Sequence, residues 1–80
     1  MNTPVKFQLI DVNSGETVYT SPVFDQKDSY ELGLRKSIID TLESIVTNDD
    51  IIPEINLVET MEDNTTRTFN AVDLYYSYEN

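Results

Sequence analysis

Residues 28–48, DSYELGLRKSIIDTLESIVTN, form the one long amphipathic segment of this chain. Its apolar residues follow the i, i+4, i+8, i+11 spacing of one helical face: Leu34, Ile38, Leu42 and Ile45. Asp28 is expected to be the N-cap, because Glu31 three residues later completes a reciprocal capping pattern. Thr47-Asn48 marks the expected end, since Asn tolerates the left-handed conformation after a helix. The segment therefore predicts a single organising helix.

Gly33 is the weak position of this helix, since Gly costs about 1 kcal/mol relative to Ala in a helix interior. Two explanations are open. Either the helix approaches a strand closely at Gly33, or its first turn is irregular.

The segment before the helix predicts a β-hairpin. Val5, Phe7 and Leu9 alternate with polar residues and are expected to face the core. The turn Asn13-Ser14-Gly15 suits a type I turn with Gly15 in the left-handed conformation. The return strand, residues 17–20, is followed by Pro22, which is typical of a sheet edge, of a strand end or of a bulge.

The segment after the helix predicts two further strands. Residues 54–61 alternate, with Ile55, Leu57 and Met61 expected to point inward. A polar turn at residues 62–65 leads to a last long strand, residues 67–76. The alternation of this strand slips near Asn70, which indicates a β-bulge or partial cover on both faces.

The order of these elements predicts an α+β fold. Residues 1–80 are expected to form one domain in which two hairpins bracket one helix (ββαββ). The helix should pack on one face of a mainly antiparallel four-stranded sheet. The other face should be solvated or covered by association.

Composition restricts the chemistry of the chain. With no Cys and no His, it lacks thiolate zinc ligands and the commonest general base. Asp11 to Gly15 begins like a calcium-binding loop, but Gly15 comes one position early and Pro22 stands at the twelfth. We expect no catalytic residues, no bound metal and no cofactor, and hence a protein that is not an enzyme. The lack of Cys and of a recognisable signal peptide favours the cytoplasm.

The acidic residues are the most informative feature of the sequence. The net charge is −10, from 15 acidic and 5 basic residues, beyond the magnitude of about 2–8 usual for a small domain. Carboxylates run through every expected element: Asp25, Asp28, Glu31, Asp40, Glu43, Asp49, Asp50, Glu54, Glu59, Glu62, Asp63 and Asp73. Their spacings, roughly 6.6–6.8 Å in a strand and about 5–6 Å on a helix, are of the order of phosphate separations. They therefore suit the groove of a nucleic-acid-binding protein, although solubility alone also explains an acidic surface.

The candidate partner-binding residues fall into two groups. The end of the helix and the start of the third strand concentrate acid at Asp40, Glu43, Asp49, Asp50 and Glu54. The second group is the aromatic tail, Tyr75, Tyr76 and Tyr78, because Tyr is frequent at interface hot spots. Packing of the tyrosines on the core is the other interpretation.

No motif identifies a family. In size, charge and order of elements the chain resembles small acidic proteins of phages and mobile elements. Several of these are DNA mimics that block restriction, repair or CRISPR effector proteins. The resemblance covers the whole chain in composition only, and it implies no site residue.

The sequence thus predicts a non-enzymatic inhibitor or regulator that mimics nucleic-acid phosphates. Its partner would be the basic surface of a nucleic-acid-binding protein, with no direct contact to nucleic acid or membrane. The alternative is a small interaction domain that forms a homodimer, or joins a larger complex, through its sheet face or last strand.

Overall fold

The structure, a computed structural model, describes residues 2–46 and 54–79. Within these stretches, four strands and two helices follow one another along the chain. Their bounds are β1 (Pro4–Asp11), β2 (Thr17–Thr20), α1 (Lys27–Val46), β3 (Ile55–Met61), β4 (Thr66–Asn70) and α2 (Ala71–Glu79). The predicted α+β class and the ββαββ order are confirmed, and α2 is an addition to them.

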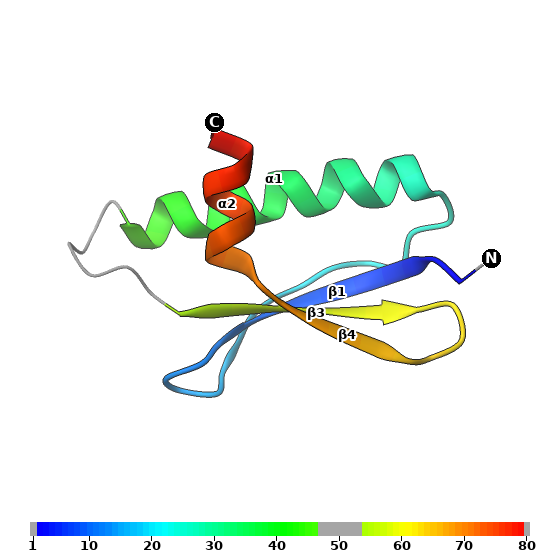
Figure 1. Ribbon diagram of the computed structural model, residues 1–80, viewed down its shortest axis with the longest axis horizontal. Helices are drawn as coiled ribbons and strands as arrows, with labels where there is room; N and C mark the ends of the chain where they lie inside the picture. The colour runs from blue at the N-terminus through cyan, green and yellow to red at the C-terminus, as the bar shows by residue number, and fades with distance from the viewer. Residues whose placement is uncertain (1, 47–53, 80) are drawn as a thin grey trace.

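The four strands form one antiparallel sheet in the order β2-β1-β3-β4. The two hairpins therefore lie side by side, and β1 and β3 form the centre of the sheet. Leu9 stands opposite Leu57 in this central pair. Both helices lie on the same side of the sheet, so the molecule has two layers (Figure 1).

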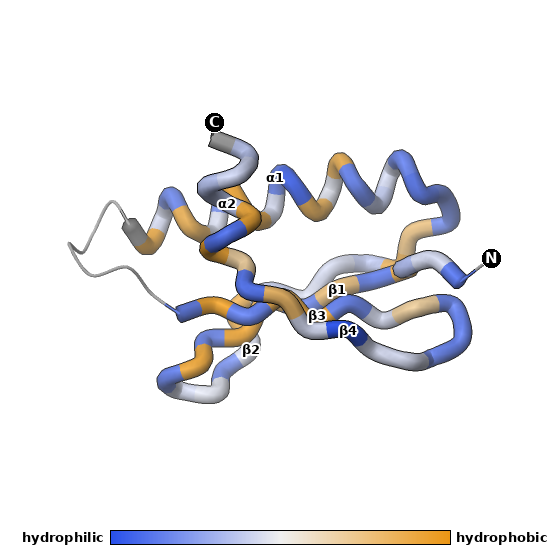
Figure 2. The backbone as a smooth tube through the Cα atoms, viewed as in Figure 1, coloured by the Kyte–Doolittle hydropathy of each residue, from blue (hydrophilic) through white to orange (hydrophobic). Residues whose placement is uncertain are grey.

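The core lies between the helices and the central strands. Leu34, Ile38 and Leu42 of α1 are buried as predicted, and Ile45 packs against them. They meet the inward-facing residues of the strands: Phe7, Leu9, Ile55, Leu57 and Met61. Figure 2 shows the resulting pattern, in which hydrophobic and hydrophilic residues alternate along α1 and along the strands. Each buried aliphatic side chain stabilises the fold by about 1.5–3 kcal/mol.

Helix α1 begins at Lys27, one residue before the predicted cap. The amide of Tyr30 donates to the carbonyl of Gln26, which makes Gln26 the residue that opens the helix. The prediction that Asp28 is the N-cap is wrong. Asp28 lies in the first turn, where its charge still meets the positive end of the helix dipole. The predicted end at Thr47-Asn48 lies outside the described residues.

Gly33 makes room for Phe24, so α1 is closely approached at this position, but by the segment between β2 and α1 and not by a strand. A Cβ atom at Gly33 would lie 2.8 Å from Cζ of Phe24, too close for contact. The Phe24 ring stacks on Phe7 at 6.4 Å and meets Tyr30 edge-to-face at 5.7 Å. The aromatic contacts that join the start of α1 to β1 therefore depend on the absence of a side chain at Gly33.

The turns of both hairpins use a left-handed residue. Gly15 has φ 75°, as predicted, although its amide bonds the carbonyl of Asp11 and the loop is one residue longer than expected. Asn64 has φ 69° in the second turn. Its amide donates to the carbonyl of Met61, and the amide of Met61 donates to the carbonyl of Thr65. Asn is among the few residues that tolerate this conformation.

The prediction of one long last strand over residues 67–76 is wrong. The strand β4 ends at Asn70, and helix α2 begins at Ala71. The side-chain oxygen of Asn70 accepts hydrogen bonds from the amides of Val72 (2.9 Å) and Asp73 (3.3 Å), so Asn70 is the N-cap of α2. The slip in alternation therefore marks a change from strand to helix and not a bulge.

The Gly33–Phe24 contact predicts that the effect of Gly33→Ala on the free energy of unfolding changes sign when Phe24 is also replaced. Gly33→Ala should lower the free energy of unfolding by about 1 kcal/mol, because overpacking outweighs the gain in helix propensity. In a Phe24→Leu background, which lacks Cζ, the same change should raise it by up to about 1 kcal/mol. Urea denaturation of the four proteins measures both values. Equal effects in the two backgrounds would contradict the contact.

The cap at Asn70 predicts a difference between two substitutions. Asn70→Ala should lower the free energy of unfolding by about 0.5–2 kcal/mol and reduce the helical circular dichroism signal. Asn70→Asp should retain most of both, because a carboxylate also accepts the two amides and favours the helix N-terminus. If residues 67–76 were one strand, Ala and Asp would behave alike.

Candidate functional site

The predicted acidic residues divide between the described and the undescribed parts of the chain. Asp40 and Glu43 are exposed on α1, and Glu54 is exposed directly before β3. Asp49 and Asp50 lie outside the described residues. The structure therefore places three of the five on the surface, near the C-terminal end of α1 and the start of β3.

Two acids from the first hairpin lie at the same end of the molecule. The strand β1 ends at Asp11, and the amide of Val12 donates to the carbonyl of Glu54 (3.0 Å). The amide of Asp11 in turn bonds the carbonyl of Glu16. Figure 1 shows the β1–β2 turn, the end of α1 and the start of β3 at one end of the long axis. We call this surface the acidic end, which comprises Asp11, Glu16, Asp40, Glu43 and Glu54.

The acidic end carries little compensating charge. Helix α1 has no basic residue in its last turn. The sequence between Lys36 and Arg67 holds eight acidic residues and no basic one. Lys27, Arg35 and Lys36 belong to the N-terminal half of α1, and Lys36 lines a shallow hollow together with Asp40. The net charge of −10 is therefore distributed unevenly along the molecule.

The predicted tyrosine group lies on a helix and not on a strand. Tyr75 and Tyr78 pack against the core, whereas Tyr76 is 45% exposed. The guanidinium of Arg35 lies 5.4 Å from the ring centre of Tyr78. Burial raises the pKa of the Tyr78 hydroxyl, and the Arg35 charge opposes this shift. Of the three, Tyr76 offers the most surface to a partner.

One acidic residue counted with the surface charges is buried. Glu59 is 5% exposed and points to the helix side of β3, in line with Ile55, Leu57 and Met61. Its inward position could have been read from the alternation of β3, since 55, 57, 59 and 61 share one face. A carboxylate at such a position needs partners, because an unpaired buried charge is costly.

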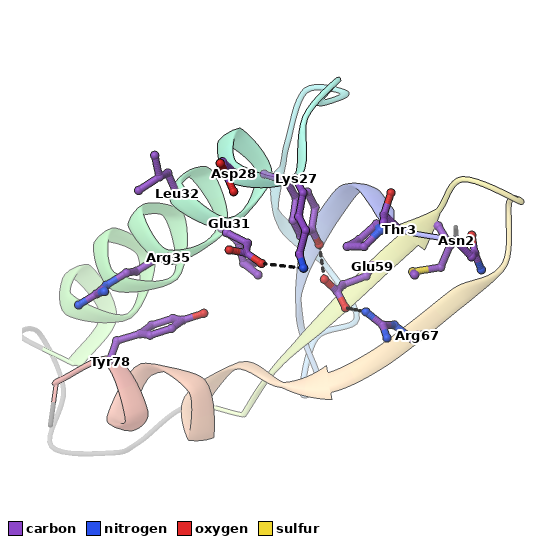
Figure 3. Close-up of a pocket in the computed structure, with 14 residues that line it drawn as sticks. Asn2, Thr3, Lys27, Asp28, Glu31, Leu32, Arg35, Glu59, Arg67 and Tyr78 are labelled. Atoms are coloured by element: carbon purple, nitrogen blue, oxygen red, sulfur yellow. Dashed lines mark hydrogen bonds and ion pairs between the residues drawn. The ribbon is translucent and has the colours of Figure 1, made fainter.

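Glu59 finds its partners on two other elements (Figure 3). The hydroxyl of Tyr30 on α1 donates to its Oε2 atom. The Nη2 atom of Arg67 on β4 donates to its Oε1 atom at 2.9 Å. Burial raises the pKa of Tyr30 well above its ordinary value, and the hydrogen bond to Glu59 adds to this effect. The three side chains bridge α1, β3 and β4.

This bridge forms part of the wall of an open groove of about 920 Å³ between the N-terminal half of α1 and β3–β4. Lys27, Glu31 and Arg35 line the helix side, and Lys27 pairs with Glu31 at 3.9 Å. Leu34 and Met61 add apolar surface. Both oxygens of Glu59 accept hydrogen bonds from the protein, so this carboxylate acts as a link between elements in the groove.

Within residues 2–46 and 54–79, no cluster of three or more acidic side chains is arranged to hold a metal ion. Neither helix there has both the length and the hydropathy that crossing a membrane requires.

The Tyr30–Glu59 bond predicts how stability changes at high pH. The folded-state pKa of Tyr30 lies above its ordinary value of 10.0. The stabilisation that the protonated Tyr30 hydroxyl gives to the fold is therefore complete below pH 10 and is lost as the pH rises above 10. Above pH 10, Tyr30 should make the free energy of unfolding of the unmodified protein fall by up to about 1.4 kcal/mol per pH unit. The Tyr30→Phe variant should lack this part of the decline. Urea denaturation at stepwise pH checks this. Tyr76→Phe, which removes an exposed hydroxyl, should leave the decline unchanged.

Comparison with protein-family models, with curated proteins and with solved structures finds no match to this chain. The chemistry of its own residues is therefore the basis for inferring its function.

Proposed function

We propose that this protein is a non-enzymatic binding protein whose acidic end occupies the basic surface of a nucleic-acid-binding protein. The observation that carries the proposal is the segregation of charge. The segments that carry the carboxylates of the acidic end, namely the β1–β2 turn, the end of α1 and the start of β3, lie at one end of the molecule (Figure 1). The basic residues of α1, Lys27, Arg35 and Lys36, belong to its other half, and Lys36 is the one nearest to Asp40.

The acids of this end belong to three separate elements, so their positions are fixed by the fold and not by one local segment. Asp40 and Glu43 are three residues apart on α1, about 5–6 Å between Cβ atoms. Glu54 is tied to the first hairpin through the carbonyl that accepts from Val12. Because the fold sets the backbone positions of these acids, binding has to order only their side chains, which favours electrostatic recognition.

The partner surface for such a set is one that binds phosphates. Lys and Arg of nucleic-acid-binding proteins meet phosphates along the backbone, and carboxylates at similar intervals can replace them. This chain resembles small acidic proteins of phages and mobile elements in size and charge, and several of those inhibit restriction, repair or CRISPR effector proteins in this way. The proposal extends to such an anti-defence role in the cytoplasm of the cell that contains the target.

Inhibition of defined enzymes tests the proposal. The probes are a restriction endonuclease, a guide-loaded Cas9-type nuclease and a DNA repair glycosylase, each titrated with the protein in the presence of duplex DNA. At least one should lose DNA binding in competition with the protein. The inhibition should weaken between 50 and 200 mM salt, because screening weakens interactions between exposed charges.

Matched charge variants locate the surface. The triple variant Asp40→Asn, Glu43→Gln and Glu54→Gln should weaken inhibition by roughly 3- to 150-fold, from about 0.2–1 kcal/mol for each lost pair. The control neutralises Asp25, just before α1, and Asp28 and Glu31 in its first turns, and changes the net charge equally. Equal loss in both variants, or no effect on any probe enzyme, would refute the proposal.

A further inference from the structure

The two edges of the sheet differ in how they are protected against pairing with another strand. The edge strand β2 is followed by Pro22, and its register with β1 shifts between Leu9 and Ile10. Pro residues and bulges are common devices that prevent edge pairing. The edge strand β4 has neither device. Its pairing with β3 runs from Thr66 to Asn70 without a shift, and its sequence, TRTFN, has no Pro and no acidic residue.

Hydrogen-bond alternation shows which backbone groups of β4 point outward. The amide of Met61 donates to the carbonyl of Thr65, so this pair is hydrogen-bonded. In an antiparallel ladder, hydrogen-bonded and non-hydrogen-bonded residue pairs alternate. The Arg67–Glu59 pair is therefore joined by backbone hydrogen bonds, and the Thr68–Val58 pair is not. The N–H and C=O of Thr66 and Thr68 consequently face away from β3 toward the open edge.

The outward groups of β4 fit a second copy of the same strand. In an antiparallel pair with a two-fold axis at Thr68, Thr68 faces Thr68 of the second copy and exchanges two backbone hydrogen bonds with it. Thr66 then faces Asn70 of the second copy, and Arg67 faces Phe69. Within one chain the Arg67 guanidinium already lies 5.4 Å from the Phe69 ring centre. The paired strands place a further cation beside each ring, which is 42% exposed in the single chain.

Charge also favours this edge over other contacts between copies. Two chains of net charge −10 repel, so a self-contact is least costly where both surfaces lack carboxylates. All five residues of β4 are exposed, and the one charged residue among them is Arg67. We propose that β4 is a self-association edge, through which two copies join their sheets into one continuous eight-stranded sheet.

The first test measures mass and uses matched variants on the two edges. Sedimentation velocity of the intact chain should show a dimer that grows with concentration and with salt, since salt screens the repulsion between the copies. Thr68→Lys places two cations on the two-fold axis and should abolish the dimer. Thr20→Lys makes the same change on the exposed β2 edge and should preserve it. Unfolding midpoints of both variants verify that they fold.

The second test fixes the register through single cysteines, which the natural sequence lacks. In the proposed pair the two copies of residue 68 have Cα atoms about 5.5 Å apart, within the usual disulfide range of about 4.4–6.8 Å. The two copies of residue 66 are about 14 Å apart along the strand axis. Mild oxidation should therefore crosslink Thr68→Cys and not Thr66→Cys.

Three results would overturn the inference. One is a monomer at concentrations up to about 1 mM, where association is already very weak. Another is equal behaviour of Thr68→Lys and Thr20→Lys. The third is equal crosslinking at positions 66 and 68. Dimerisation strengthens with salt whereas binding of the acidic end to a basic partner weakens, so the failure of one proposal is distinguishable from the failure of the other.

Discussion

The fold depends on the burial of one face of α1 against the central strand pair. Leu34, Ile38 and Leu42 are held by Phe7 and Leu9 on β1 and by Ile55 and Leu57 on β3. Burial of apolar surface is the main force that stabilises a small domain, and 80 residues allow only one such core. The rest of the structure is arranged around it. The hairpins supply the sheet, and α2 packs against α1 and β3 on the same side of it.

A second constraint is polar. Glu59 lies on the face of β3 whose other residues are apolar. Its two carboxylate oxygens accept hydrogen bonds from Tyr30 and Arg67. The Arg67 side chain is half-exposed, so the ion pair itself adds little net stability, but separating Glu59 from its partners would leave a buried carboxylate unpaired. Because the members come from α1, β3 and β4, the bridge specifies how the second hairpin sits beneath the helix. It also removes one carboxylate from the surface, so the exposed negative charge is concentrated elsewhere.

Periodicity in the sequence predicts the helix, the inward residues of β1 and β3 and the left-handed Gly15, because each follows from local geometry. It fails at residues 71–79, since Val72 and Tyr75 have strong β-propensity and α2 is short. Packing against the core and the cap at Asn70 override that propensity there. The burial of Glu59 depends on Tyr30 and Arg67, which are distant in sequence, and no local pattern pairs them. For the candidate site, sequence locates the acids of α1 and β3 but not their meeting with Asp11 and Glu16, which requires the sheet register.

The strand order has a consequence for how the chain folds. Each hairpin pairs strands that are neighbours in sequence, whereas the seam between β1 and β3 joins Asp11 to Ile55 and Pro4 to Met61. Closing a loop of this length costs entropy before any contact is gained, so distant pairings form more slowly than local ones. The hairpins and α1 thus contain the local contacts, and pairing of β1 with β3 joins the two hairpins. Until it closes, β1 has one unpaired edge and the apolar face of α1 lacks half of the surface against which it packs.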